Sequence, residues 1–254
     1  MIQAIFFDID GTLIPFDKET MPKSTLMALW KAKEKGVKLF VATGRAPNNI
    51  DHVKKLFPFD GFLTANGQYC FNHDSIIHER YICQEDVKNI IPYIEENKIP
   101  IIFITLDSCY RNKYNINDTR WPIADLSTLI DQPLIQMIAI IDESEDETLL
   151  SHLPHCKSAR WNPRSIDIIP SDGGKDTGID EIIKYYHIPL ENVMAFGDSG
   201  NDLSMLKHVG YGIAMGNASE TIKKQVPYTT TDIEDNGILN ALLHFEVLKK
   251  EDIK

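Results

Sequence analysis

Basic side chains are scarce in this sequence. Its 254 residues include 26 lysines and arginines against 37 aspartates and glutamates, which leaves a formal net charge of −11. Nucleic-acid binding needs a basic surface that displaces counterions, so the acid excess argues against a nucleic-acid partner and against an anionic membrane. The same excess is at odds with a phosphate-bearing ligand, unless some of the acids gather around a cation.

Long apolar runs and the usual metal-binding spacings are also missing. No stretch approaches the roughly 18 apolar residues that span a membrane. The N-terminal segment has no basic region before its short apolar run, which favours the cytoplasm. Cys70, Cys83, Cys109 and Cys156 show neither CxxC pairing nor a metal-ligand rhythm, so free thiols are expected. The histidines have no HxH or HExxH spacing, which leaves a zinc site unsupported, and without GxxxxGK(S/T) a P-loop nucleotide hydrolase is excluded.

The two ends of the chain predict a parallel α/β sheet. Residues 5–7, 39–42 and 193–196 are short continuous apolar runs, typical of strands buried on both faces. Strand–helix alternation implies right-handed crossovers between parallel strands. Helices are expected at residues 22–35, 47–56, 176–186, 202–208 and 237–245.

The middle of the chain follows another pattern. Its expected elements are a helix at 85–97, strands at 101–106, 133–141 and 165–169, and a helix at 145–153. Polar loops such as 111–120 separate the strands, which suits an antiparallel sheet covered by helices. We therefore expect a second α+β domain at 83–170, inserted into an α/β core made of residues 1–82 and 171–254.

Polar clusters follow three of the expected core strands. Residues 8–12 (DIDGT) come directly after the first strand, residues 43–45 (TGR) after the second, and residues 197–202 (GDSGND) after a later one. In open α/β sheets, ligands bind in the crevice beyond the carboxyl ends of the strands. The three clusters are therefore expected to meet at one site.

Four aspartates dominate these clusters. Asp8 and Asp10 straddle the end of one strand, and Asp198 and Asp202 arrive from another. Carboxylates packed this closely raise one another's pKa, which a hard divalent cation such as Mg²⁺ relieves. A metal-bound aspartate can attack phosphorus, while a second acid protonates the leaving oxygen and then deprotonates the attacking water. The acids thus become compatible with a small phosphorylated substrate.

Taken in order, these motifs resemble those of the haloacid dehalogenase (HAD) superfamily of phosphatases. The matching segments are residues 8–12 (like DxDGT), 42–45 (like the second motif), Lys175 (like the third-motif lysine) and 197–202 (like GDxxND). Residues 65–67 (ANG) and 214–218 (AMGNA) are similar to secondary signatures of the Cof-type subfamily. The long stretch between the second and third motifs holds the inserted domain, as in the class IIB cap.

The resemblance implies a Rossmann-like HAD core with a C2B-type cap that sets specificity. It implies that Asp8 is the nucleophile and Asp10 the general acid and base. Thr43 and Gly44 would hold the phosphoryl oxygens, and Lys175 would bridge nucleophile and phosphate.

A magnesium site is also implied by the resemblance. Mg²⁺ would take the Asp8 carboxylate, the Asp10 backbone carbonyl and Asp198. Asp202 would bind it through water or support another ligand, and Asn201 would help order that loop.

Several positions keep two interpretations. Arg45 either contacts substrate or neutralises the acid cluster, and Asn66 either contacts substrate or only forms a turn. Asn217 either fixes a loop or touches the site. Asp176 stands where Cof-type sequences usually have a small residue, and it either caps the following helix or pairs with Lys175. Each cap candidate for specificity either contacts substrate or only packs in the cap or on its surface; the candidates are Tyr110, Arg111, Tyr114, Arg120, Trp121 and Trp161.

The leading hypothesis is a cytoplasmic, Mg²⁺-dependent phosphatase of small phosphorylated metabolites, with hexose phosphates as the favoured class. We expect a monomer or small homo-oligomer without nucleic-acid or membrane partners. Two alternatives stay open: a phosphomutase on the same scaffold, and a non-catalytic phospho-switch or binding module.

Overall fold

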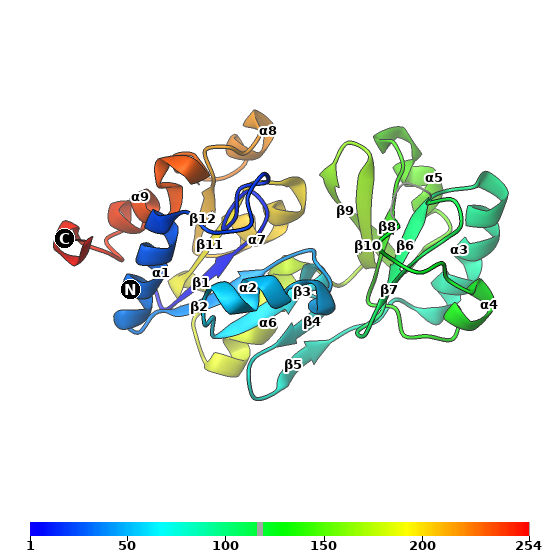
Figure 1. The fold of residues 1–254 in the computed structure, drawn as a ribbon, viewed down its shortest axis with the longest axis horizontal. Coiled ribbons are helices and arrows are strands. Elements are labelled where there is room, and N and C mark those ends of the chain that lie inside the picture. The colour runs from blue at the N-terminus through cyan, green and yellow to red at the C-terminus, as the bar shows by residue number, and fades with distance from the viewer. Residues whose placement is uncertain (116–118, 254) are drawn as a thin grey trace.

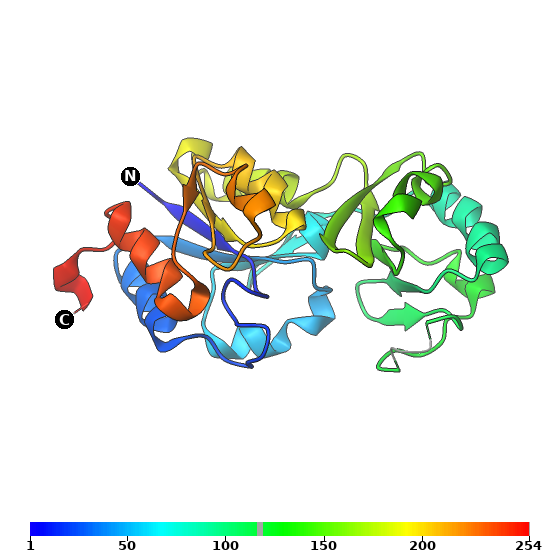
Figure 2. The same cartoon turned by 90° about the horizontal axis from the view of Figure 1, so that it is seen from above.

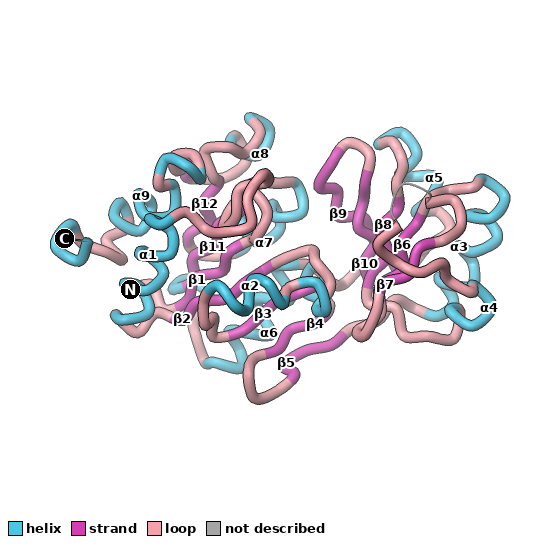
Figure 3. The backbone as a smooth tube through the Cα atoms, viewed as in Figure 1, coloured by secondary structure: helices cyan, strands magenta, loops and turns pink. Residues whose placement is uncertain are grey.

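A large twisted sheet forms the centre of the core domain. The computed structural model describes residues 1–115 and 119–253. The strands of this sheet are β1 (Ala4–Phe7), β2 (Lys38–Ala42), β3 (Gly61–Thr64), β4 (Tyr69–Phe71), β5 (Ile76–Glu79), β11 (Val193–Gly197), β12 (Tyr211–Ala214) and β13 (Tyr228–Thr229). Their order is β13-β12-β11-β1-β2-β3-β4-β5, and all neighbours are parallel except the pairs β3–β4 and β4–β5. Figure 3 shows the strands of this sheet in magenta, apart from those of the second sheet.

Helices cover both faces of this sheet (Figures 1 and 2). One face packs against α1 (Lys23–Glu34), α2 (Asp51–Leu56) and α9 (Gly237–His244), and the other against α6 (Lys175–Tyr186), α7 (Leu203–His208) and α8 (Glu220–Lys223). Successive strand residues point to opposite faces, so Ile5 and Phe7 join the first layer while Ala4 and Phe6 join the second. Because both faces are buried, the strands are continuous apolar runs, as the sequence predicted.

The order of the strands creates a crevice at the end of β1. The chain passes from β1 to β2 on one side, and after the inserted domain it returns as β11 on the other side. A topological switch point of this kind leaves room for a ligand beyond the carboxyl ends of the strands. Asp8, Thr43 and Asp198 each directly follow one of these three strands.

The inserted domain is built on an antiparallel sheet. Its strands are β6 (Ile101–Ile104), β7 (Cys109–Arg111), β8 (Gln136–Ala139), β9 (Cys156–Asn162) and β10 (Ser165–Pro170), in the order β7-β6-β8-β10-β9. Helices α3 (Gln84–Asn97), α4 (Leu126–Leu129) and α5 (Asp146–Leu150) cover the face turned away from the core (Figures 1 and 2). The other face packs Ile102 and Ile104 with Ala46 and Ala65 of the core.

The expected α/β core with an inserted α+β domain is confirmed, with local differences. The helix expected at 145–153 is a 3₁₀ turn, Glu143–Glu145, followed by the short α5. The polar loop expected at 111–120 begins inside β7, and residues 116–118 of it lie outside the described residues. The sequence did not predict some of the strands, namely β3, β4, β5, β7, β9, β12 and β13. For example, β9 (CKSARWN) is a polar edge strand without an apolar run. The domain limits at 82/83 and 170/171 stay a prediction.

Among the described residues, no helix is both long enough and apolar enough to cross a membrane.

A tight turn after β3 positions one wall of the crevice. In the 3₁₀ helix η2 (Ala65–Gly67), Ala65, Asn66 and Gly67 have φ of 48°, 52° and 92°. Such left-handed values are costly for residues with a Cβ. A Cβ on Gly67 would lie 2.1 Å from the carbonyl oxygen of Gly174, directly before α6. The turn therefore needs glycine for its conformation and for close packing.

We predict that Gly67→Ala destabilises the protein much more than Gly36→Ala. Both glycines have positive φ, at 92° and 83°, but a Cβ on Gly36 would meet nothing within 4 Å. Gly36→Ala should therefore cost only about 1–2 kcal/mol of conformational strain. Gly67→Ala should cost about 1–3 kcal/mol more, because Gly174 has to move. Denaturant unfolding measures both, and equal losses would contradict the packing argument.

Candidate active site

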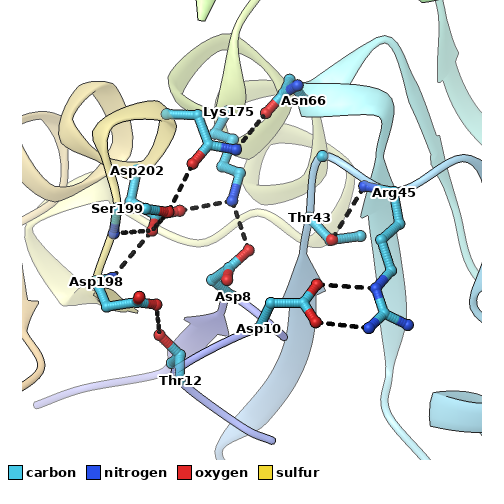
Figure 4. A network of polar contacts seen from close by, with 12 residues as sticks. Asp8, Asp10, Thr12, Thr43, Arg45, Asn66, Lys175, Asp198, Ser199 and Asp202 are labelled. Atoms are coloured by element: carbon cyan, nitrogen blue, oxygen red, sulfur yellow. Dashed lines mark hydrogen bonds and ion pairs between the residues drawn. The ribbon is translucent and has the colours of Figure 1, made fainter. Parts of the chain in front are cut away.

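A buried lysine joins two of the motif aspartates (Figure 4). Lys175 is the first residue of α6, and its Nζ donates to Asp8 Oδ1 at 2.7 Å and to Asp202 Oδ1 at 2.6 Å. The Lys175 and Asp202 side chains have no exposed area, and that of Asp8 is 7% exposed. The sequence motifs at residues 8–12, 175 and 197–202 therefore meet at one point, as expected.

The loop after β11 is ordered around Asp202. Its Oδ2 accepts the backbone N–H groups of Asp198 and Ser199, both at 3.0 Å, while Oδ1 accepts Lys175. Thr12 Oγ1 donates to Asp198 Oδ1 at 2.9 Å and so joins this loop to the loop after β1. Both Asp202 oxygens already have partners, which suits a supporting position better than a direct metal ligand.

Burial raises the pKa of two of these carboxyl groups. The pKa of Asp8 rises to about 7, first through burial, with Lys175 opposing the shift and Asp202 adding to it. The pKa of Asp198 rises to about 8, first through burial and then through Asp202 and Asp8. Burial alone would lower the pKa of Lys175, but Asp202 and Asp8 raise it above its ordinary value. The ammonium form of Lys175 is therefore firmly held.

The donor set fits a hard divalent cation. Oxygen atoms of Asp8, Asp198 and Asp202 lie within 4.8 Å of one another. Three clustered carboxylates face the single charge of Lys175, so an added cation would offset the repulsion among them. Oxygen-only ligands of this kind suit Mg²⁺ rather than a softer metal.

Asp10 turns away from this cluster toward Arg45. Arg45 Nε donates to Asp10 Oδ2 at 2.9 Å, and Arg45 Nη2 donates to Asp10 Oδ1 at 2.6 Å. The hydrogen bond to Asp10 raises the pKa of Arg45. Beside them, Thr43 Oγ1 accepts the backbone N–H of Arg45 at 3.1 Å. Of the two interpretations of Arg45, the structure displays the neutralising one, and a substrate contact stays a prediction.

The side chain of Asn66 joins the core to the cap. Its Nδ2 donates to Asp167 Oδ2 at 2.6 Å and to Gln136 Oε1 at 3.0 Å, both on the cap sheet. Its Oδ1 accepts Asn201 Nδ2 at 3.1 Å. Gln136 Nε2 in turn donates to the Gly44 carbonyl at 3.2 Å. Asn66 is therefore more than a turn residue, and Asn201 links its own loop to this contact.

Asp167 is a site residue that the sequence analysis missed. It is 3% exposed, and its Oδ1 accepts Trp161 Nε1 at 2.9 Å. Burial raises its pKa to about 7, against the opposing hydrogen bonds from Asn66 and Trp161. A Cβ on Gly44 would lie 2.9 Å from Asp167 Oδ2, so glycine is needed there for close approach. Successive side chains of a strand point to opposite faces of the sheet, and this pattern could have revealed Asp167. Ile166 and Ile168 face the cap helices, so Asp167 between them faces the core.

A cavity of about 460 Å³ lies between the two domains. The core contributes Asp8, Asp10, Thr43 and Arg45 to its lining. The cap contributes polar and aromatic residues, Arg120, Trp121, Trp161, Ser165 and Asp167, and an apolar wall of Ile102, Ile104, Ile138 and Ile140. The core side of the cavity is therefore charged, and the cap side combines polar, aromatic and apolar groups.

Three of the candidate specificity residues do not line this cavity. Tyr110 packs against the core of the cap, and the Tyr114 hydroxyl donates to the Glu95 carbonyl at 3.1 Å. Arg111 donates to the backbone carbonyls of Trp121 and Asn115 at 3.0 and 3.1 Å. These three residues pack within the cap, because their strand and loop positions direct them there.

Asp176 lies in the first turn of α6, which begins at Lys175 with Gly174 as its N-cap. An acidic side chain is favourable at this end of a helix, in line with the first of its two interpretations. Lys175 is engaged by Asp8 and Asp202 instead. Asn217 has the loop-fixing position: its Nδ2 donates to the Gly11 carbonyl at 2.8 Å, and its Oδ1 accepts the Ile233 N–H.

A parallel α/β core, an inserted cap and this lysine–aspartate cluster define a HAD-type hydrolase. A family model described as haloacid dehalogenase-like hydrolase matches residues 5–242, and the chain belongs to this family.

Several proteins similar to this chain are described as phosphatases. The putative phosphatase YkrA of Bacillus subtilis is 28% identical, with 97% of this chain and 99% of YkrA covered. The structure of the HAD subclass IIB sugar phosphatase BT4131 superposes with a TM-score of 0.90 at 37% identity and covers 97% of this chain and all of that one. The HAD phosphatase BT1666 of Bacteroides thetaiotaomicron gives a TM-score of 0.90 at 28% identity, with 98% and 96% covered. The protein is therefore an enzyme, a phosphatase of the HAD superfamily with the subclass IIB architecture.

We predict that Lys175→Met destabilises the protein by about 3–5 kcal/mol at pH 8 without divalent ions. Removing the ammonium group leaves the buried carboxylates of Asp8 and Asp202 without their partner. The control Lys184→Met removes an 80%-exposed lysine from the same helix and should change the unfolding free energy by less than about 0.5 kcal/mol. Denaturant titration measures both, and equal effects would show that the ion pairs do not stabilise the fold.

We also predict that Asp167→Asn changes how stability depends on pH. With a pKa of about 7, Asp167 keeps its proton in the folded protein, whereas the unfolded chain releases it above about pH 4. The folded state then binds more protons, so this group makes the wild-type unfolding free energy fall as pH rises, by at most about 1.4 kcal/mol per pH unit between about pH 4 and 7. The variant lacks this contribution.

The unfolding free energy of Asp167→Asn should therefore rise relative to wild type across that window and stay level above it. Urea titrations at several pH values without metal measure the difference. The exposed Asp107→Asn serves as control and should give a curve parallel to wild type. A parallel curve for Asp167→Asn would contradict the raised pKa.

Proposed function

We propose that this phosphatase is Mg²⁺-dependent and hydrolyses small phosphorylated metabolites, with sugar phosphates as the favoured class, through an aspartyl-phosphate on Asp8. The proposal rests above all on the buried Lys175–Asp8 ion pair beside the Asp198 carboxylate, where Asp8 lines the cavity between the two domains. The lysine orients the Asp8 carboxylate and offers positive charge where a phosphate would enter.

The residues that would hold Mg²⁺ are Asp8, Asp198 and the backbone carbonyl of Asp10. Asp202 supports them, because Lys175 and two backbone N–H groups already occupy its oxygens. When bound, Mg²⁺ would draw negative charge from the transferring phosphoryl group and the nucleophile.

In the first step, an Asp8 oxygen attacks phosphorus and the bond to the leaving oxygen breaks. Thr43, the Gly44 backbone and Lys175 hold the phosphoryl oxygens, and Asp10 gives its proton to the departing alcohol. In the second step, Asp10 takes a proton from water, the water attacks phosphorus, and Asp8 leaves with its carboxylate restored. Inorganic phosphate and the alcohol are the products.

The Asp10 side chain has to break its ion pair with Arg45 before it can protonate the leaving oxygen of the substrate. The Asp10 side chain is 43% exposed, so it has room to rotate, whereas Asp8 is fixed by Lys175. An entering phosphate is a competing anionic partner for Arg45. Phosphate binding would thus release Asp10 for acid–base chemistry.

The cap residues that line the cavity favour a polyhydroxylated leaving group. Asp167 and Ser165 offer hydrogen-bonding atoms, while Trp121 and Trp161 offer flat apolar faces. A buried carboxyl group at this position disfavours a second anionic group on the substrate. Relatives agree in chemistry: BT4131 is described as a sugar phosphatase, and YitU of Bacillus subtilis, 26% identical over 95% of this chain and 96% of YitU, as a 5-amino-6-(5-phospho-D-ribitylamino)uracil phosphatase.

The cysteines suit a cytoplasmic enzyme. Cys70, Cys83, Cys109 and Cys156 are all free thiols in the structure. Free thiols persist in reducing compartments.

We predict that Asp8→Asn abolishes release of phosphate from a panel of phosphorylated sugars and other metabolites in the presence of Mg²⁺. Losing the nucleophile should lower kcat by about 1,000-fold or more while the variant stays folded, as circular dichroism would show. The control Asp74→Asn replaces an exposed aspartate in the β4–β5 turn and should leave turnover unchanged. Undiminished Mg²⁺-dependent hydrolysis by Asp8→Asn would exclude this nucleophile.

The same panel separates the alternatives by product. Hydrolysis gives one free phosphate for each substrate consumed, and in ¹⁸O-labelled water the phosphate carries the label. A phosphomutase would convert one hexose phosphate into an isomer without releasing phosphate. A phospho-switch would accept one phosphoryl group per chain and stop.

A further inference from the structure

The cap holds a second cluster of metal-ligating side chains, apart from the active site. Among the described residues, two groups of three or more such side chains have their ligand atoms within 4.8 Å of one another: the active-site aspartates, and Cys83, Asp86 and His155. The second group lies where α3 begins and where the chain enters β9. None of these three residues lines the active-site cavity.

Asp86 forms the buried centre of this cluster. Its side chain has no exposed area, although it lies in the first turn of α3. Its Oδ2 accepts the backbone N–H of His155 at 2.9 Å, and its Oδ1 lies 3.0 Å from His155 Nδ1. The His155 side chain is 56% exposed and Cys83 is exposed, so solvent and ions can reach the cluster from outside.

One thiol, one carboxylate and one imidazole make up the cluster. Three protein ligands leave the fourth position of a tetrahedral ion open to water. Sulfur, imidazole nitrogen and a single carboxylate oxygen suit Zn²⁺, whereas Mg²⁺ prefers oxygen ligands throughout.

The cluster lies at the base of the cap, where both connections to the core run. Cys83 and Asp86 follow the first connection directly, and Cys156 pairs with Pro170 at the end of β10, where the second connection begins. The His155 carbonyl accepts the N–H of Ser171 at 2.8 Å. An ion held here would join α3 to the β9–β10 hairpin and stiffen the base of the cap.

We propose that Cys83, Asp86 and His155 form a Zn²⁺ site in the cap, with water as the fourth ligand. Binding releases the thiol proton of Cys83 and leaves His155 neutral, because thiolate and neutral imidazole are the ligating forms. Two distant segments supply the ligands, residues 83–86 and His155, so the site forms only in the folded cap. This site is independent of the proposed phosphatase mechanism.

Cobalt titration of the reduced full chain tests the site, with Mg²⁺ in excess to occupy the active site. A Co²⁺ ion bound by thiolate gives a sulfur-to-cobalt charge-transfer absorption in the near ultraviolet, whereas one bound by carboxylates alone does not. We expect this absorption in wild type and its loss on adding Zn²⁺. Asp8→Asn should retain it, which separates this site from the nucleophile.

Ligand variants and a matched cysteine control complete the test. Cys83→Ser and His155→Ala should weaken the binding by about 100-fold or more, since even losing an outer-shell partner costs about 10–100-fold. Cys70→Ser should leave it unchanged, because Cys70 is fully buried in the core domain. Zn²⁺ should raise the melting temperature of wild type but not of Cys83→Ser.

Two results would overturn the proposal. One is a reduced wild-type protein without the charge-transfer absorption, or with the same absorption in Cys83→Ser. The other is a melting temperature that Zn²⁺ fails to raise in wild type, or raises equally in Cys83→Ser.

Discussion

The buried ammonium group of Lys175 is the interaction on which the geometry of this site depends. A charge without exposed surface is tolerated only when charged partners satisfy it, and here Asp8 and Asp202 do so at 2.7 and 2.6 Å. Asp8 follows β1, Asp202 follows β11, and Lys175 begins α6 directly after the cap. One ion-pair triad therefore ties together the two central strands and the point where the chain returns from the inserted domain.

A chain of polar contacts extends this triad into the cap. Asp202 accepts the N–H of Ser199, Ser199 Oγ donates to Asn201, and Asn201 donates to Asn66. Asn66 then donates to Asp167, which also accepts Trp161. The wall of the cavity is thus hydrogen-bonded, through continuous steps, to the loop that holds the lysine. Because hydrogen bonds are directional, this network fixes the orientation of the cap sheet over the crevice, in addition to the apolar packing.

Much of the core could be predicted because its signals are local. An apolar run followed by DIDGT, TGR or GDSGND marks a buried strand and the polar loop at its end, and parallel topology brings such ends together. Lys175, Asp8 and Asp202 meet as that reasoning required. The pairing of Arg45 with Asp10 matches one of the two interpretations of Arg45, between which the motif alone could not decide. Asp167 was missed because a lone acid between isoleucines looks like any strand residue until the covered face of its sheet is known.

The cap was harder to predict, since its partners come from distant segments and no short motif marks them. Arg120, Trp121 and Trp161 reach the cavity, whereas Tyr110, Arg111 and Tyr114 turn into the cap itself. The cysteines showed no metal-ligand rhythm in sequence, yet folding places Cys83 beside His155. The sequence by itself determined the α/β core, its inserted domain and the aspartates and lysine of the site, because strand ends and motif order are properties of short segments. Only the tertiary structure decided which cap side chains face the core, because that depends on which sheet face the helices cover.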